Sequence, residues 1–148
     1  MKLLAVNKRA KFDYDLQETM EAGLVLTGPE VKSAKAGSVQ LKGAFLDMRG
    51  GQLWLKNGFI SKYPPAASAQ TEYDPSRDRK VLVHKREMKR LIGKKKADGF
   101  TLVPVSIYLK GNLIKLAFAI GKGKKVYEKR EALKKRDVQR QIRQHMRE

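Results

Sequence analysis

The chain has 148 residues and no cysteine, and its 33 Lys and Arg against 15 Asp and Glu give a formal net charge of +18. Disulfides and thiolate zinc sites are therefore excluded, and no apolar run approaches the roughly 20 residues of a membrane span. The apolar run from Leu3 to Val6 is too short for a signal peptide, so we expect a cytoplasmic protein. Because a polyanion would relieve the self-repulsion of this charge, nucleic acid is the favoured partner and an anionic membrane the second.

Strict alternation predicts a long strand near the N-terminus. Between Phe12 and Leu26 the apolar side chains occupy even positions, which is typical of a half-buried strand. Gly23 suggests a bend or bulge within it. A long bent strand is what a small barrel uses to belong to both of its walls.

A short helix is predicted next, over Pro29 to Ala36. Proline suits the first turn of a helix, Thr27 or Gly28 could cap it, and Gly37 suits its C-terminal end.

Two β-hairpins are predicted, each around a glycine-containing turn. Two strands from Val39 to Met48 and from Gln52 to Ile60 flank Gly50-Gly51, and two more from Phe100 to Tyr108 and from Leu113 to Ile120 flank Gly111-Asn112. The stretch between the hairpins predicts a surface loop over Ser61 to Asp78, a short strand over Arg79 to Val83 and a basic helix over His84 to Lys96.

This order of elements predicts a mainly β protein, an OB-type antiparallel β-barrel with added α-helices and a basic C-terminal tail. We expect residues 1–120 to form the barrel and residues 121–148 the tail. The tail holds 11 Lys and Arg and four Asp and Glu, a net of +7 by subtraction. Its three apolar residues in a helical row cannot hold a helix by packing alone, so we expect it to be mobile when free and helical when bound to an anionic partner.

Signatures of catalysis are missing from the sequence. The string nearest to a phosphate-binding loop, "GLVLTGP", has Pro29 where the lysine must be. His84 and His145 have no companions at metal-ligand spacing, and nothing places Glu21 and Glu30 together as an acid and base pair. We therefore expect a binding protein, without cofactor or metal, rather than an enzyme.

Three basic clusters favour RNA or DNA as the partner. They are Lys8, Arg9 and Lys11, then Arg77 to Lys96 with ten basic and two acidic residues, and then the tail. One such cluster is usually a solvated face, but three on one small barrel form an electrostatic footprint for phosphates. Tyr14, Tyr63, Tyr73 and Tyr127 are candidates to stack on bases. Tyr14 and Trp54 are expected in the core instead, whereas Tyr127 lies among charges and favours stacking.

The chain resembles the SmpB family, whose members bind transfer-messenger RNA, also called SsrA RNA. The resemblance rests on an ordered set of motifs spread over nearly the whole chain: "NKRAKFDY" from Asn7, "EAG" from Glu21, "GPEVKSAKAG" from Gly28, "DPSRDRK" from Asp74, "LIGK" from Leu91, "TLVP" from Thr101, "GKK" from Gly123 and "EKR" from Glu128. Phe12 departs from the His that the family often has, and Pro29, Gly121 and Glu128 are further local departures.

The resemblance implies an OB-fold barrel and a role in trans-translation, the rescue of ribosomes stalled on messages without a usable stop codon. The barrel would bind the tRNA-like domain of transfer-messenger RNA. The family motifs imply contacts from Asn7, Lys8, Arg9, Glu21, Glu30 and Lys32, with Arg77 and Lys80 as additions. Glu21 could accept hydrogen bonds from the RNA or orient a neighbouring cation, or it could be a solvent-facing strand residue with an indirect effect.

The resemblance also implies that the tail enters the decoding centre and the empty messenger channel of the ribosome, where it folds as a helix. Gly123 would permit the turn out of the barrel, and Tyr127 would stack on a ribosomal base. The remaining tail positions expected to meet the ribosome are Lys124, Lys125, Glu128, Lys129, Arg130, Lys134, Lys135, Arg136, Arg140, Arg143 and Arg147.

The translation elongation factor and alanyl-tRNA synthetase that act on the same RNA are implied as further partners, and we expect a monomer. A ribosomal or general structured-RNA-binding protein is the alternative within the same class. A membrane-surface module is a second alternative, disfavoured because the apolar row of the tail lacks Trp, Phe and Leu.

Overall fold

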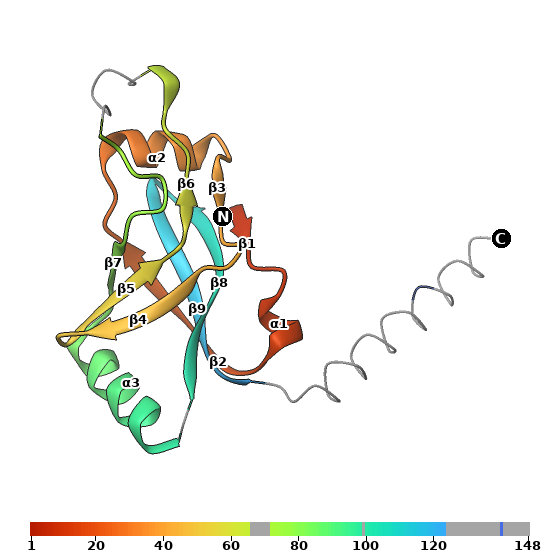
Figure 1. The fold of residues 1–148 in the computed structure, drawn as a ribbon, viewed down its shortest axis with the longest axis vertical. Helices are drawn as coiled ribbons and strands as arrows, with labels where there is room; N and C mark the ends of the chain where they lie inside the picture. The colour runs from red at the N-terminus through yellow and green to blue at the C-terminus, as the bar shows by residue number, and fades with distance from the viewer. Residues whose placement is uncertain (66–71, 99, 124–139, 141–148) are drawn as a thin grey trace.

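Seven antiparallel strands form the main sheet of the computed structural model, which describes residues 1–65, 72–98, 100–123 and Arg140 (Figure 1). Their order across the sheet is β1-β8-β9-β2-β7-β5-β4. The strands are β1 (Lys2–Val6), β2 (Tyr14–Leu24), β4 (Phe45–Arg49), β5 (Gln52–Lys56), β7 (Arg79–Leu82), β8 (Thr101–Lys110) and β9 (Leu113–Gly123). Two short strands, β3 (Val39–Gln40) and β6 (Phe59–Ile60), pair separately.

The main sheet curls on itself, so that β4 at one edge lies against β8 near the other edge, although no ladder joins these two strands among the described residues. Register shifts interrupt the ladders between Leu3 and Ala5, between Leu16 and Glu18, and between Pro104 and Ser106. Such bulges bend strands and increase their twist, which is what a curled sheet requires. The expected class, a mainly antiparallel β protein with added helices, is confirmed in the form of a partly open barrel.

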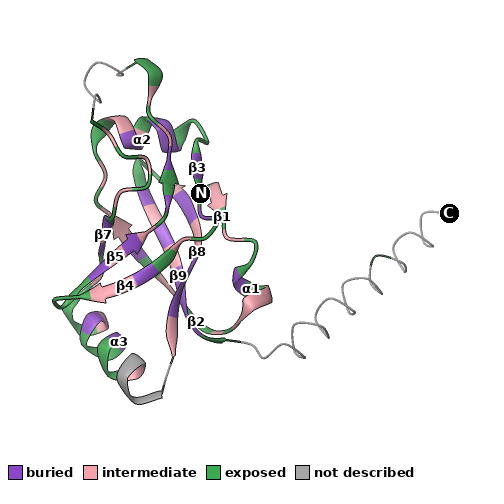
Figure 2. Ribbon diagram, in the orientation of Figure 1, coloured by how far each residue is buried: buried purple, intermediate pink, exposed green. Residues whose placement is uncertain are grey.

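The core fills the interior of the curled sheet (Figure 2). Alternation places one face of each strand inward, as in β5, where Leu53 and Leu55 are buried on either side of half-buried Trp54. Leu116, Phe118 and Ile120 of β9 lie at its centre, each at most 1% exposed.

Within residues 1–123, three described helices accompany the sheet: α1 (Ala10–Asp13), α2 (Gly28–Lys35) and α3 (Lys85–Asp98). Helix α2 begins with a capping box, in which the Thr27 hydroxyl accepts from the Glu30 amide at 3.3 Å and Glu30 accepts from the Thr27 amide at 2.9 Å. The helix predicted from Pro29 to Ala36 is confirmed within one residue. None of the helices in the described ranges is long and apolar enough to cross a membrane.

Three predicted strand boundaries were wrong. The first strand begins at Tyr14, because residues 10–13 form α1, in which the Asp13 backbone amide donates a hydrogen bond to the Arg9 carbonyl at 2.8 Å. The predicted strand over 39–48 is broken near Gly43, at φ 75°, and the one over 52–60 at Asn57, at φ 59°. A left-handed residue cannot continue a ladder, and the alternating pattern did not reveal it. Strand β1 was not predicted, since its apolar run is short.

Both predicted hairpin turns are confirmed. Gly50 and Gly51 have φ angles of 60° and 72°, the left-handed pair that a two-residue hairpin prefers, and Gly111 has φ 61°. At the far end of the second hairpin, β9 continues past Ile120 and pairs Gly121, Lys122 and Gly123 with Leu16, Asp15 and Tyr14. The ladder therefore extends three residues beyond the predicted limit of the barrel at residue 120.

Candidate nucleic-acid interface

The segment Asn7 to Arg9 leaves β1 and is fixed to β8 by the first of these residues. The Asn7 side-chain amide donates to the Pro104 carbonyl at 2.8 Å, and its backbone amide donates to the Val105 carbonyl at 2.8 Å. Lys8 and Arg9 follow with exposed side chains. Asn7 therefore holds two exposed cations in a defined place on the barrel.

Arg9 is oriented by two neighbours on α1. Its guanidinium forms an ion pair with Asp13 at 3.1 Å and lies 4.7 Å from the centre of the Phe12 ring. Stacking on Phe12 restricts the long side chain while leaving it in contact with solvent.

A cavity of about 360 Å³ lies beside this segment. Its walls come from three separate stretches of chain, which are Asn7 to Tyr14, Gly43 to Phe45 and Thr101 to Pro104. Phe45 is 45% exposed there. The sequence analysis did not single out Phe45. It predicted one strand over 39–48, whereas the structure has two strands, β3 and β4, separated near Gly43.

Glu21 lies on β2, opposite Ala117 of β9, and its carboxylate is engaged by β8. The Tyr108 hydroxyl donates to it, and Lys110 Nζ lies 3.4 Å away. The Tyr108 hydrogen bond and the charges of Lys110 and Lys115 lower the pKa of Glu21 against its desolvation. Burial, and then the bond to Glu21, raises the pKa of Tyr108 to about 12. Glu21 is thus an anion at neutral pH that orients Tyr108 and Lys110.

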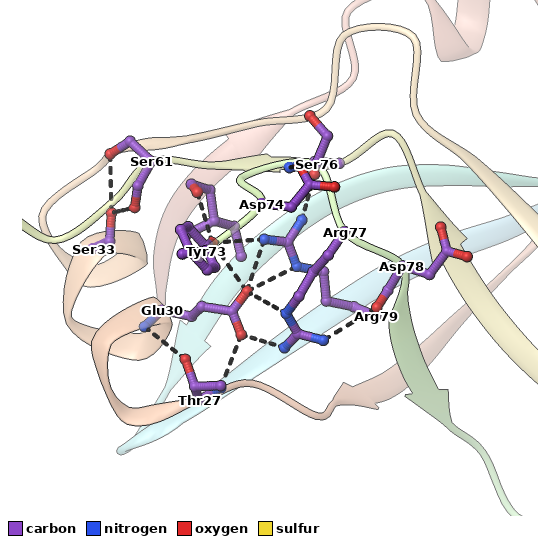
Figure 3. A network of polar contacts seen from close by, with 12 residues as sticks. Thr27, Glu30, Ser33, Ser61, Tyr73, Asp74, Ser76, Arg77, Asp78 and Arg79 are labelled. Carbon is purple, nitrogen blue, oxygen red and sulfur yellow. Dashed lines mark hydrogen bonds and ion pairs between the residues drawn. The ribbon is translucent and has the colours of Figure 1, made fainter. Parts of the chain in front are cut away.

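Glu30 is the centre of a polar cluster at one end of the barrel (Figure 3). Its side chain is fully buried. The carboxylate accepts a hydrogen bond from Nε of Arg77 at 3.0 Å, and two from Arg79, from Nε at 3.0 Å and from Nη2 at 2.7 Å. A second nitrogen of Arg77 also donates to it, making that pair bidentate. Arg79, itself 0% exposed, donates in addition to the Gly58 carbonyl.

Tyr73 completes the cluster from the segment before β7. Its hydroxyl lies 2.7 Å from the Ile60 carbonyl and 3.1 Å from Glu30, and it accepts from Arg79 at 2.8 Å. One hydroxyl proton serves only one of the two acceptors at a time. Burial, opposed by the charge of Arg79 and aided by that of Glu30, raises the pKa of Tyr73 to about 12.

The cluster fixes the charge of Glu30. Burial alone would raise its pKa, but hydrogen bonds from Arg77, the Thr27 amide and Arg79 outweigh burial and lower the pKa to about 2. With Glu30 at −1 and the two arginines at +1 each, the cluster carries a net charge of +1. The half-buried side chain of Arg77 brings that charge to the surface.

The expected contact of Glu30 with RNA stays a prediction; in this structure its carboxylate is buried, and both of its oxygens have partners within the protein. Tyr73, a candidate for stacking on bases, is half-buried and takes part in this cluster through its hydroxyl. Arg79 was missed, although its position two residues before buried Val81 puts it in the inward phase of the strand.

The other predicted barrel residues lie on the surface in different places. Lys32 is exposed on α2, with Nζ 5.9 Å from the centre of the Tyr63 ring. Lys80 is half-buried on β7, opposite Trp54 of β5. Tyr14 is half-buried at the start of β2. The predicted barrel residues therefore form two local groups, Asn7 with Lys8 and Arg9, and Glu30 with Arg77, and the others lie apart from these.

Gly123 belongs to β9, where it pairs with Tyr14, and its φ is not left-handed. The ladder thus runs up to Gly123, and the expected turn out of the barrel there stays a prediction, because the next residues lie outside the described part of the chain. Arg140 is exposed. The following predicted tail residues lie outside the described part of the chain: Lys124, Lys125, Tyr127, Glu128, Lys129, Arg130, Lys134, Lys135, Arg136, Arg143 and Arg147.

Within the described ranges, no group of three or more His, Cys, Asp or Glu side chains could hold a metal ion. The fold and surface thus define a basic, partly open β-barrel that presents oriented cations. A family model described as SmpB protein matches residues 4–148, and the chain belongs to this family.

Relatives and a solved structure agree with that assignment. The chain is 47% identical over 147 residues to an SsrA-binding protein of Anoxybacillus flavithermus, covering 99% of this chain and 94% of that protein. It is 47% identical over 141 residues to an SsrA-binding protein of a Sulfurihydrogenibium species, covering 95% and 91%. A chain of the solved structure "tmRNA-SmpB: a journey to the center of the bacterial ribosome" matches with a TM-score of 0.66 and 42% identity, covering 86% of this chain and 92% of that one.

Replacing Glu30 by Gln is expected to lower the free energy of unfolding by about 3 kcal/mol at pH 7, because Arg79 is left buried without a counter-charge. Urea unfolding followed by circular dichroism measures this. Glu72→Gln, at an exposed carboxylate, is the control and should change stability by less than about 0.5 kcal/mol.

The same pair of variants gives a pH test. The folded-state pKa of Glu30 is about 2, below the ordinary 4.5, so its contribution to stability is present above pH 4.5 and is lost as the pH falls towards 2. In the wild-type protein and in Glu72→Gln, the free energy of unfolding should fall as the pH is lowered from 4.5 towards 2. In Glu30→Gln the part of this fall that Glu30 causes should be missing. Equal acid slopes in all three proteins would contradict the cluster's role.

Proposed function

We propose that this chain binds the tRNA-like domain of transfer-messenger RNA and delivers it to stalled ribosomes for trans-translation. The observation that carries the proposal is the family assignment over residues 4–148, with relatives named SsrA-binding protein at 47% identity along nearly the whole chain. The structural neighbour, whose description joins tmRNA, SmpB and the bacterial ribosome, supports it independently.

The net charge of +18 supplies affinity for RNA, because each cation that meets a phosphate releases counterions. Phosphate contacts alone do not select a sequence, so selection rests on the shape of the RNA. A barrel that holds its cations at fixed positions suits that task. We assign the contact with the tRNA-like domain to Asn7, Lys8 and Arg9. Glu21, Lys32 and Lys80 are further residues that we propose contribute to it.

Glu30 and Glu21, which the family motifs imply as contacts, contribute indirectly in this proposal. Glu30 positions Arg77, whose surface side meets solvent, and Arg77 is the member of the cluster that can reach a phosphate. Glu21 acts by orienting Tyr108 and Lys110.

We place the second half of the function in the residues after Gly123, which carry ten Lys and Arg against four Asp and Glu. This segment would enter the decoding centre and the empty messenger channel, drawn by ribosomal RNA phosphates, and fold there as a helix. In this proposal the protein is a cytoplasmic monomer that acts by binding, beside the elongation factor and alanyl-tRNA synthetase that use the same RNA.

The net charge of +18 favours one other candidate, a general structured-RNA-binding protein. Such a protein would show similar affinity for any folded RNA, and its binding would follow total charge.

Replacing Lys8 and Arg9 together by Ala is expected to weaken binding to the tRNA-like domain roughly tenfold and to lower the salt slope by about 1 to 2. The matched control, Lys35→Ala with Lys89→Ala, removes the same charge at exposed positions outside the proposed contact. Fluorescence anisotropy at several salt concentrations measures both. Equal losses in the two double variants would show that binding follows net charge alone.

A chain ending at Gly123 is expected to keep its affinity for the tRNA-like domain within about tenfold, since β9 and its ladder remain whole. It should lose tagging of nascent chains in a reconstituted translation reaction stalled on a message without a stop codon. Full-length protein is the control. Loss of folding or of RNA binding in the shortened chain, or retained tagging, would rule out this division of labour.

A further inference from the structure

Trp54, the only tryptophan of the chain, lies on the outer face of the barrel. Its neighbours Leu53 and Leu55 are buried at 1% and 2% exposure, so alternation directs Trp54 to the opposite side of the sheet. The expectation that it belongs to the core was wrong, because β5 has one buried face and its tryptophan is not on it. Packing in the core therefore does not explain why a tryptophan stands at this position.

The strands on either side give Trp54 charged neighbours. Asp47 of β4 and Lys80 of β7 stand directly opposite it across the two ladders. The guanidinium of Arg49, two residues beyond Asp47 on the same face, lies 5.5 Å from the centre of the indole ring. Arginine and tryptophan in this arrangement form a cation and π pair, and both present flat surfaces.

The acidic groups on this face are already occupied. Lys56 Nζ lies 3.5 Å from Asp47 and 4.0 Å from Asp78, and Arg49 lies 3.8 Å from Asp78. Three cations, Arg49, Lys56 and Lys80, thus face two carboxylates, a net of +1 by subtraction. The face attracts a phosphate and does not repel one.

The same face continues into the cavity beside Asn7 and Arg9. Phe45 of β4 stands opposite Lys56, which places it diagonally from Trp54 at about 7 to 8 Å on the same side of the sheet. Phe45 also lines the cavity that contains Asn7 and Arg9. Phe45 therefore lies between the proposed RNA contact and Trp54, next to both.

We propose that Trp54, held by Arg49, is a stacking site for an unpaired RNA base, and that Lys80 receives the adjoining phosphate. Every base has a π face, so a flat indole binds unpaired bases whatever their identity. A paired base offers no such face, and the site distinguishes single-stranded from duplex segments. This inference rests on the proposed function in taking RNA as the partner, and it adds a site beyond the residues that the family motifs indicated.

Because Trp54 is the only tryptophan, its intrinsic fluorescence reports directly on the site. The test is a titration of the full-length protein with a single-stranded decauridylate and with an RNA duplex of ten base pairs, followed by tryptophan emission and by anisotropy of labelled RNA. We expect the single strand to quench Trp54 and the duplex to bind with little quenching. Trp54→Ala should weaken single-strand binding roughly tenfold, and Trp54→Phe less than threefold.

Phe59→Ala is the matched control, an exposed aromatic on β6 outside this face, and its affinity should stay within twofold. Circular dichroism melting checks the fold of each variant, and quenching in the wild-type protein decides the question even where Trp54→Ala is unstable. Binding of decauridylate with no change in emission, or equal affinity of Trp54→Ala and the wild type, would overturn the stacking site. Neither result would affect the proposed function, which fails separately if the wild-type protein shows no preference for the tRNA-like domain.

Discussion

The buried carboxylate of Glu30 holds helix α2 against the segment that leads into β7. It receives hydrogen bonds from Arg77, Arg79, Tyr73 and the first turn of its own helix. A carboxylate removed from water is costly unless its oxygens are fully satisfied, and here they are. The end of the barrel therefore depends on one charge, whereas the middle depends on apolar packing around Leu116 and Phe118.

In the described part of the chain, the barrel buries one ion pair and keeps its other charges at or near the surface. Among the described residues other than 95–98, Glu30 and Arg79 are the charged side chains that the barrel buries, and the remaining lysines and arginines are half-buried or exposed. A surface of this kind repels itself, and any polyanion that binds the folded state relieves the repulsion and stabilises the fold. The sheet holds Asn7 through β8 and Trp54 through two ladders, so the backbone sets the spacing between these two residues. That fixed spacing is what shape recognition of an RNA requires.

Alternation and turn chemistry were enough to predict the strand β2, the helix α2 and both hairpins, because these depend on local patterns. The splits at Gly43 and Asn57 were missed, since an apolar run does not show where one backbone residue adopts a left-handed φ. The family motifs singled out Glu30 but did not reveal that its side chain is buried. Its burial results from two arginines 47 and 49 positions away in the sequence, and a tertiary contact of this kind leaves no local signal. Trp54 was misplaced for the opposite reason: its size suggested the core, and the alternation with Leu53 and Leu55 should have taken precedence.

Selective binding is the measurement that tests the account most directly. The affinity of the full-length protein for the tRNA-like domain of transfer-messenger RNA would be compared with that for an ordinary tRNA and for an unstructured RNA of equal length, at several salt concentrations. The account predicts a strong preference for the tRNA-like domain that persists at physiological salt, because fixed contacts add to the counterion term. Three equal affinities that fall together with salt would contradict it and would leave the charge of +18 as the sole source of binding.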